Sequence, residues 1–367
     1  MFLPKIIMKV LQLFVILLMT TCISNAQNAV TEKGRTPKNI ILMIGDGMGT
    51  SQIYAGMVAN KNTLNLERAQ FVGFHKNQSA NNFITDSAAG ATALSTGKKT
   101  LNDAVGVDAD GKPQLTILEA AEHNGLATGM VVTCSITHAT PASFIAHQPY
   151  RGMNAEIAAD FLRTDIDVFI GGGKNDFDKR KDGRNLIDSL KSNGYQIAGS
   201  MEEVRKVKSG KLAGFLAEGD LPSISAGRGD QLSVSSEVAI SILKQNDKGF
   251  FLMVEGSQID WGGHKNNLKY ITDEVVDFDK TIGKVFDFAE KDGNTLVIIT
   301  ADHETGGLSI RGGDTKTGEI KGSFSTKKHT GVMIPVFAFG PGSEAFAGIY
   351  ENTAIFDKMI AALKLKK

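Results

Sequence analysis

An aspartate and a serine stand side by side in the segment TDSAAGAT (residues 85–92), and almost nothing but small side chains follows them. Aspartate and serine are good helix N-cap residues and alanine favours helix, so Asp86 and Ser87 predict the start of a helix. The same position suits an activated serine nucleophile, because the backbone N–H groups at a helix N-terminus attract an anion. The small residues would then leave the approach to Ser87 open. The octet alone favours a helix cap, and a nucleophile needs supporting residues elsewhere.

Carboxylates and imidazoles gather at the ends of apolar segments that have the composition of strands. These residues are Asp46, Glu255, Asp260, His264, Asp302, His303 and His329. Asp260 and His264 are four positions apart, so one helical turn would place both on the same face, where they could bind one ion. Taken singly, each residue is also a common turn or cap residue. Together, the nitrogen and oxygen ligands suit zinc, with an oxygen-only site suited to magnesium.

Short apolar runs alternate with helical patterns along the chain. Residues 39–47 (NIILMIGDG) are an apolar run that ends in a glycine-flanked carboxylate, and residues 116–135 show a helical pattern, a glycine stop and another apolar run. Continuous apolar strands that alternate with helices predict an α/β fold, a three-layer α/β/α sandwich with a large, mostly parallel central sheet. Ligands bind such sheets at the carboxyl ends of the strands, where the polar residues accumulate in this sequence.

The N-terminal segment has the layout of a secretory signal peptide. Two lysines precede the apolar run VLQLFVILLM (residues 10–19), and a small-residue site ends at Ala26. The run is too short to span a bilayer comfortably, so residues 1–26 predict a signal peptide and export to the periplasm or the cell exterior. Lipid attachment at Cys22 is the alternative for this segment. No repeat or long linker follows, which predicts a single catalytic domain over residues 27–367.

Charge and cysteine content exclude some classes of protein. The chain has 40 basic and 40 acidic residues and no basic stripe, so nothing in it indicates specific nucleic-acid binding. Without the signal peptide, Cys134 is the remaining cysteine, so no internal disulfide is expected. Its place at the end of an apolar run predicts a buried, inert thiol. Stability is therefore expected to come from the core and from bound metal.

Several motifs together resemble those of the alkaline phosphatases, a family of metal-dependent phosphomonoesterases. The matching stretches are NIILMIGDGMG, ITDSAAGATALSTGKKT, THATPASFIAH, FFLMVEGSQIDWGGH, TADHETGG and KHTG. They occur in the family's order and extend over essentially the whole chain after the signal peptide. The resemblance implies hydrolysis of small phosphate monoesters through a phosphoserine, at a site with two zinc ions and one magnesium ion.

The family's site residues carry over to this sequence one by one. The resemblance implies that Ser87 is the phosphorylated nucleophile and that Arg151, in HQPYRG, grips the phosphate. It assigns one zinc ion to Asp260, His264 and His329, a second zinc ion to Asp46, Asp302, His303 and the Ser87 oxygen, and magnesium to Glu255, Thr140 and the bridging Asp46. Two divalent ions can clamp the attacking and leaving oxygens of an in-line displacement, and a forked guanidinium can bind two phosphate oxygens.

Some residues near these motifs vary among members of the family. His138 stands where one well-known bacterial type has an aspartate and animal enzymes have a histidine, which implies an altered magnesium shell. Thr305 replaces a histidine that orients a zinc-binding aspartate in some members, so zinc affinity is expected to differ. Trp261 occupies a variable position and predicts either an apolar wall near the metals or ordinary core packing. Asp86 is expected to position the turn and nearby groups rather than to bind metal.

The segment between His303 and His329 is short. Many relatives of this family insert a crown subdomain there, and that subdomain helps to form a dimer. Its absence here leaves the oligomeric state open, a homodimer included.

The alternative function is that of a phosphodiesterase or nucleotide pyrophosphatase of the same superfamily. Such relatives typically lack the arginine and the magnesium residues, so Arg151, Thr140 and Glu255 favour the monoesterase. A sulfatase would need a Cys or Ser followed by Pro and Arg, and the residues after Ser87 offer neither. A non-catalytic phosphate-binding module predicts a missing nucleophile or ligand, and none is missing from the motifs.

Overall fold

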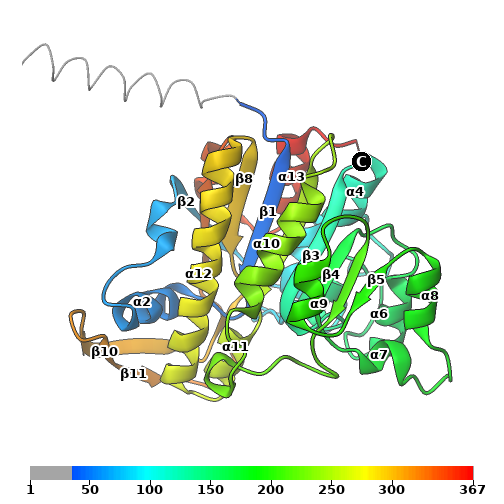
Figure 1. Cartoon of the computed structure of the whole chain (residues 1–367). Helices are drawn as coiled ribbons and strands as arrows, with labels where there is room; N and C mark the ends of the chain where they lie inside the picture. Colours follow the sequence, from blue (N-terminus) through cyan, green and yellow to red (C-terminus); the bar gives the residue numbers. More distant parts are fainter. Residues whose placement is uncertain (1–34, 367) are drawn as a thin grey trace, which may run out of the picture.

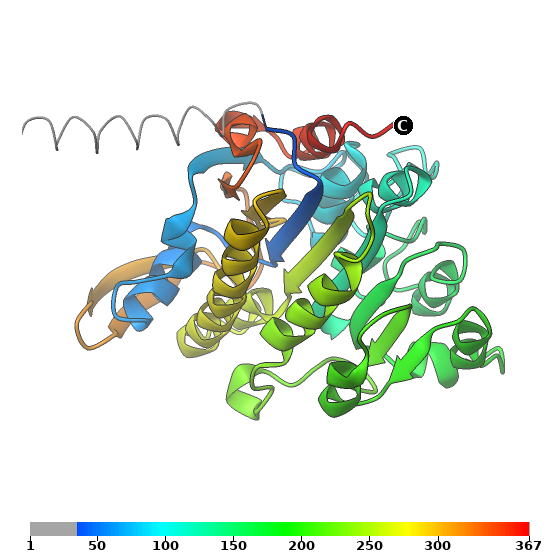
Figure 2. The ribbon, with the colours of Figure 1, turned by 45° about the horizontal axis from the view of Figure 1, so that its top comes forward.

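The computed structural model describes residues 35–366 (Figure 1). The predicted signal peptide (residues 1–26), with Cys22, lies outside these residues. Within the described chain, one large sheet is covered by helices on both faces, which confirms the predicted three-layer α/β/α sandwich (Figure 2). No helix of residues 35–366 is both long and apolar enough to cross a bilayer.

Ten strands of the described chain form the central sheet, in the order β14-β2-β13-β8-β1-β7-β3-β4-β6-β5. In chain order they are β1 (Asn39–Gly45), β2 (Phe71–Lys76), β3 (Ala127–Ser135), β4 (Val168–Gly172), β5 (Gln196–Ala198), β6 (Leu212–Phe215), β7 (Phe250–Gly256), β8 (Thr295–Thr300), β13 (Ile334–Phe339) and β14 (Gly348–Glu351). β13 runs antiparallel to its neighbours β2 and β8, and the other strand pairs are parallel. The sheet is therefore mostly parallel, as the continuous apolar runs predict.

The central strand β1 contributes to a hydrophobic core on each face of the sheet. Ile40, Leu42 and Ile44 pack in one core, while Ile41 and Met43 pack in the core on the opposite face. Successive side chains of a strand point to opposite faces, so one continuous apolar run fills both cores. β1 lies between β7 and β8, and the polar residues that follow these three strands therefore meet at one edge of the sheet.

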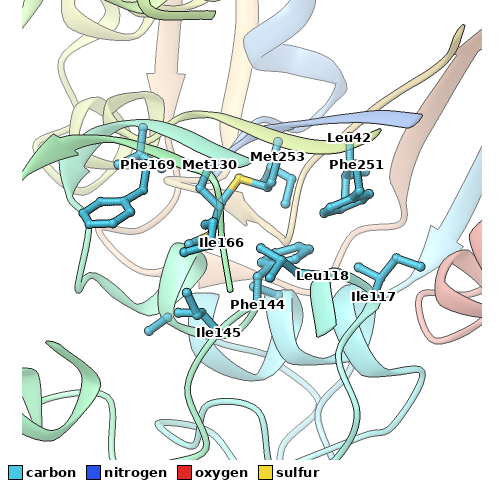
Figure 3. Close-up of a cluster of buried hydrophobic side chains, with 14 of the residues drawn as sticks. Leu42, Ile117, Leu118, Met130, Phe144, Ile145, Ile166, Phe169, Phe251 and Met253 are labelled. Carbon is cyan, nitrogen blue, oxygen red and sulfur yellow. The ribbon is translucent and has the colours of Figure 1, made fainter. Parts of the chain in front are cut away.

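Two groups of helices cover the two faces (Figure 2). The face of Ile41 is covered by α2 (Thr50–Ala59), η1 (Asn65–Arg68), α9 (Met201–Lys206), α10 (Gln231–Leu243), α11 (Gln258–His264) and α12 (Leu268–Asp292), with η2 (Ile224–Ala226) beside α12. The face of Leu42 is covered by α3 (Ser87–Thr96), α4 (Ile117–His123), α5 (Ala139–Ala142), α6 (Asn154–Asp160), α7 (Asn175–Asp178), α8 (Leu186–Ser192), η3 (Ser343–Phe346) and α13 (Ala354–Leu363). Figure 3 shows Leu42 and Phe251 from the sheet in one cluster with Leu118 of α4 and Phe144.

The helix and strand predicted within residues 116–135 are both present. The Thr116 side chain caps α4 by accepting a hydrogen bond from the backbone N–H of Glu119. Gly125 follows the helix with a φ of 78°, a left-handed conformation that glycine adopts at little cost, and β3 begins at Ala127. The local signals in this segment are sufficient to set its structure.

The segment between His303 and His329 forms two small sheets and no subdomain. β10 (Leu308–Asp314) and β11 (Glu319–Phe324) make an antiparallel hairpin that contacts α2 (Figure 1). β9 (Glu304–Thr305) pairs antiparallel with β12 (His329–Thr330). The β9–β12 pairing returns the chain to its starting point, so that the His329 ring stacks on the His303 ring.

Candidate active site

Ser87 is the first residue of α3 and follows its N-cap directly. Asp86 is the cap, because its carboxylate accepts a hydrogen bond from the backbone N–H of Ala89. The Ser87 side chain is buried, and its Oγ lies 3.1 Å from Nε2 of His303. The predicted helix start is confirmed, and it brings the serine to one of the predicted metal ligands. The two interpretations of the octet are thus compatible.

The small residues after Ser87 serve the packing of α3. Ala88 and Ala91 are fully buried in the core on this face of the sheet. A Cβ at Gly90 would lie 3.0 Å from both Cβ and the carbonyl oxygen of Asp302. Small side chains therefore let α3 approach the strand end that carries Asp302. The expectation that they leave the approach to Ser87 open stays a prediction.

Asp46, Asp302 and His303 form one group of metal-type ligands. All three are fully buried, and each offers a ligand atom within 4.8 Å of those of the other two. Nε2 of His303 lies 3.4 Å from Oδ1 of Asp46 and 3.2 Å from Oδ2 of Asp302. The backbone N–H of Gly47 donates to Oδ1 of Asp302 at 3.2 Å, which leaves Oδ2 directed to the group. Ser87 joins this group through His303.

A second group forms around Asp260, which α11 carries one turn before His264. Nε2 of His264 lies 3.3 Å from Oδ2 of Asp260, as the spacing predicts, and 3.2 Å from Nε2 of His329. Nε2 of His329 lies 3.6 Å from Oδ1 of Asp260. Asp260, His303 and His329 also have ligand atoms within 4.8 Å of one another, so the two groups adjoin at His303.

Backbone carbonyls fix the orientation of two of these imidazoles. Nδ1 of His264 is 2.7 Å from the carbonyl oxygen of Lys327, and Nδ1 of His329 is 2.9 Å from that of Thr85. Each Nδ1 therefore donates its proton to a carbonyl, which directs Nε2 into the group, where it can bind a cation once Nε2 is deprotonated. The carbonyl of Thr85 precedes Asp86 and Ser87, so the histidine and the serine are positioned by the same turn.

A third set of oxygens lies between β7, α5 and the end of β1. Oε1 of Glu255, Oγ1 of Thr140 and both carboxylate oxygens of Asp46 are buried without a hydrogen-bond partner in the described chain. Buried polar atoms are normally satisfied, and those that are not demand an explanation. Oxygen donors of this kind fit a hard cation such as magnesium.

Burial and crowding raise the pKa values of three of these carboxylates. Burial, and then the charge of Asp260, raises the pKa of Asp302 to about 7. Burial raises the pKa of Glu255 to about 8, and burial with the nearby carboxylates raises the pKa of Asp46 well above its usual value. Asp260 is the exception: although burial opposes it, the hydrogen bond with His264 lowers its pKa. Divalent cations would compensate these buried negative charges, so the donor set fits the metals that the sequence predicts.

Arg151 is held beside Ser87 by the residue that caps α3. Nη1 of Arg151 is 3.2 Å from Oδ2 of Asp86, and Nη2 is 3.5 Å from Nε2 of His138. The backbone N–H of Asp103 donates to the same Asp86 oxygen at 3.0 Å. Asp86 thus positions the turn and a nearby group, as predicted, and the group is the arginine itself. A cavity of about 460 Å³ beside Arg151 is lined in part by His138 and Tyr150.

The residues that vary in the family surround the ligands. Thr305 donates a hydrogen bond to Oδ1 of Asp260 and lies 3.2 Å from Nδ1 of His303, so a hydroxyl orients the aspartate here. Trp261 is partly buried, and its ring meets the His138 ring edge-on at 6.2 Å between centroids. Its position therefore supports both interpretations, core packing and a wall next to the metal residues. Cys134 is fully buried, as predicted.

One buried carboxylate beside the ligands was not singled out in the sequence interpretation. Glu304 follows the two candidate ligands of the motif TADHETGG, and the residue is 4% exposed. A carboxylate two positions from a metal ligand could be a ligand itself, and no local signal distinguishes this from another role. Its partners, Gln52 and Thr330 among them, lie in other segments of the chain.

Comparisons with known proteins agree with this geometry. A family model described as alkaline phosphatase matches residues 37–321. Alkaline phosphatase 3 of Bacillus subtilis (strain 168) is 36% identical over 413 residues, with 89% of this chain and 89% of that protein covered. Alkaline phosphatase of Escherichia coli (strain K12) is 34% identical over 409 residues, with 90% of this chain and 86% of that protein covered.

Solved structures give the same result. The alkaline phosphatase from the Antarctic bacterium TAB5 matches with a TM-score of 0.86 at 44% identity, and the match covers 91% of this chain and 99% of that chain. A variant of that enzyme in which a histidine is replaced by aspartate was solved with magnesium bound in its M3 site. The similarity in fold and sequence thus extends over nearly all of the chain.

Proposed function

This chain belongs to the alkaline phosphatase family, metal-dependent hydrolases of phosphate monoesters, and we propose that it works through a phosphoserine on Ser87 at a site for two zinc ions and one magnesium ion. The observation that carries the proposal is the contact of Ser87 Oγ with His303 Nε2 at 3.1 Å. His303 itself lies against Asp46 and Asp302. A serine hydroxyl is a weak nucleophile alone, and this contact puts it at a group of metal-type ligands.

The residues present would hold three ions. Asp260, His264 and His329 would hold one zinc ion, Asp46, Asp302, His303 and the Ser87 oxygen the other, and Glu255, Thr140 and Asp46 the magnesium ion. When bound, the divalent ions lower the pKa of the Ser87 hydroxyl and stabilise the charge on the attacking and leaving oxygens. The rest of the reaction depends on the chain's own groups.

Arg151 binds the phosphate group of the substrate, and Ser87 attacks it. The guanidinium of Arg151 binds two non-bridging phosphate oxygens, and Asp86 holds it in place through Nη1. Ser87 Oγ attacks the phosphorus atom, the bond from phosphorus to the alcohol oxygen breaks, and the alcohol leaves. Water then attacks the phosphoserine, releasing inorganic phosphate and restoring Ser87. The N-terminus of α3 presents backbone N–H groups to the phosphate during both steps.

Four further features of the protein remain predictions. We expect a single catalytic domain over residues 27–367 and export by the segment 1–26, with lipid attachment at Cys22 as the alternative. The oligomeric state, a homodimer included, is open. Small phosphate monoesters are the expected partners, without specific binding of nucleic acid.

Replacement of Arg151 separates the monoesterase from the alternative phosphodiesterase. Wild-type protein is expected to hydrolyse p-nitrophenyl phosphate at least about 100-fold faster than bis(p-nitrophenyl) phosphate. Arg151→Ala is expected to lower kcat/KM for the monoester about 100-fold, because two charge-assisted hydrogen bonds are lost. The diester, with one negative charge fewer, is expected to lose less. Steady-state kinetics on both esters measures this.

The matched control for Arg151→Ala is Arg163→Ala. The Arg163 side chain is 77% exposed and pairs with Asp160, away from Ser87. Its removal is expected to leave both rates within about twofold, because the guanidinium is exposed and the buried Asp160 keeps its hydrogen bonds from Gln148 and the backbone N–H of His147. Equal or better turnover of the diester by the wild type would overturn the choice of a monoesterase.

Replacement of His138 tests the proposed magnesium site. Nδ1 of His138 is buried without a partner, beside the set that contains Thr140. His138→Asp is expected to raise the affinity for magnesium about tenfold, because a carboxylate is a better magnesium ligand than an imidazole. The magnesium-bound variant of the TAB5 enzyme, also a histidine-to-aspartate change, supports this expectation.

Isothermal titration calorimetry with magnesium measures how His138→Asp changes the magnesium affinity. His123→Asp makes the same chemical change on an exposed residue at the end of α4 and is expected to leave the affinity unchanged. Equal magnesium affinities in all three proteins would place the magnesium site elsewhere.

A further inference from the structure

Glu304 is a buried carboxylate whose hydrogen bonds are all made within the protein. Oε1 accepts from Nε2 of Gln52 and from the backbone N–H of Leu308, the latter at 3.3 Å. Oε2 accepts from Oγ1 of Thr330 and from the backbone N–H of Gly307, the latter at 3.2 Å. Both oxygens are therefore engaged by donors, and the carboxylate is held as an acceptor for the protein rather than as a metal ligand.

One of these bonds connects Glu304 to the segment of His329. Thr330 lies directly opposite Glu304 in the β9–β12 pair, and His329 lies opposite Thr305. A ladder of two residues is weak by itself, so the bond from the Thr330 hydroxyl to Glu304 adds a needed link. It fixes His329 relative to His303, whose ring lies 3.5 Å from the His329 ring between centroids.

Glu304 also contacts the segment that follows Asp46 in the sequence. Gln52, in the first turns of α2, donates to Glu304 and also to the carbonyl oxygen of Thr305 at 2.8 Å. A Cβ at Gly49 would lie 2.5 Å from Cγ of Glu304, so only glycine permits this close approach. Gly49 and Gln52 belong to the turn and helix that follow Asp46.

From these contacts we propose that Glu304 is a positioning residue, which holds the segments of Asp46, His303 and His329 at the separation that zinc requires. The inference rests on the proposed zinc sites and extends them to a residue outside the ligand set. No large subdomain follows His303 in this chain, and the β9–β12 pair with its hairpin is the local structure that brings His329 back. Glu304 is the side chain that links this pair to α2.

The rate of zinc release tests the proposal directly. Wild type, Glu304→Gln, Thr330→Val and the double variant are loaded with zinc, freed of excess metal and mixed with a chromogenic chelator. Glu304→Gln and Thr330→Val are each expected to release zinc about 10- to 100-fold faster, the range found when a partner of a metal ligand is removed. Since both changes break the same bond, the double variant is expected to exceed Glu304→Gln by no more than about twofold.

Two further measurements separate positioning from general stability. Excess zinc is expected to restore kcat of Thr330→Val to within about twofold, because every ligand is still present. Glu319→Gln removes a carboxylate that is 61% exposed on the same hairpin, and its zinc release is expected to match the wild type. Thr330→Val keeps the buried carboxylate and therefore provides the test if Glu304→Gln does not fold.

The proposal is overturned by release rates within twofold of wild type in Thr330→Val, by effects that multiply in the double variant, or by a kcat that zinc does not restore. A wild-type protein that binds no zinc would instead remove the proposed metal-dependent function. The two failures are therefore distinguishable in one experiment.

Discussion

Ser87→Ala is expected to form no phosphoenzyme and to lose at least about 10³-fold in kcat/KM for a phosphate monoester. The hydroxyl of Ser87 lies at the N-terminus of α3, and its Oγ is 3.1 Å from His303 Nε2. Alanine keeps the helix start, since Asp86 provides the cap. The loss would therefore report chemistry and not folding. Acid quenching followed by mass spectrometry detects the phosphoserine, and steady-state kinetics gives the rate.

Ser95→Ala is the matched control for this variant. Ser95 lies on the same helix, is equally buried and donates a hydrogen bond to the carbonyl oxygen of Ser143 at 2.6 Å. Its loss is expected to lower stability by about 1 kcal/mol and to leave the phosphoenzyme in place. Normal turnover by Ser87→Ala, or a phosphoenzyme in that variant, would sink the mechanism.

Removal of metal with a chelator is expected to abolish activity and to lower the melting temperature, with a larger drop at pH 8 than at pH 6. Burial raises the pKa of Asp302 to about 7 and that of Glu255 to about 8 in the metal-free protein. In an unfolded chain both groups titrate near pH 4. Between these values the folded state binds more protons than the unfolded state, so the free energy of unfolding falls as pH rises from about 4 to about 8. Bound cations compensate the ionised carboxylates and remove this loss.

Asp46→Asn is expected to raise the stability of the metal-free protein and to lower the activity of the metal-loaded protein. Asp46 is fully buried, and burial, followed by the charges of Asp302, Asp260 and Glu255, raises its pKa. A neutral amide relieves that repulsion, so the metal-free variant is expected to melt several degrees above the metal-free wild type at pH 8. The same change removes a shared ligand, so activity with added zinc and magnesium is expected to fall about 100-fold or more.

Calorimetric melting at both pH values, with and without metals, measures these effects. Full activity after thorough chelation would remove the metal-dependent mechanism. Equal melting temperatures of metal-free wild type and Asp46→Asn at pH 8 would show that the buried carboxylates do not repel one another as the geometry indicates.

Local patterns in the sequence determined the elements and the residue types at their ends. The apolar run before Asp46 is short and rich in isoleucine, which favours a strand that is buried on both faces. Asp86 and Ser87 had to begin a helix, because a cap satisfies backbone N–H groups that the helix leaves free. The spacing of Asp260 and His264 put both on one face of α11. These effects act between residues that are close along the chain, so they can be predicted from the sequence.

Contacts between distant segments could not be predicted in the same way. Asp86 binds Arg151, Gly90 packs on Asp302, and Thr305 orients Asp260 only because the sheet order brings those segments together. Hydrogen bonds between distant segments leave no periodic pattern in the sequence. The residues near Asp86 therefore do not reveal its partner.

What the sequence by itself determined is therefore the chemistry available at the strand ends, a serine, an arginine and a set of oxygen and nitrogen ligands. What the tertiary structure decided is which of these side chains touch. Glu304 shows the difference most clearly, because a buried carboxylate beside His303 could be a ligand or a support. Gln52 and Thr330, far from it along the chain, take up its oxygens, and that arrangement makes it a support.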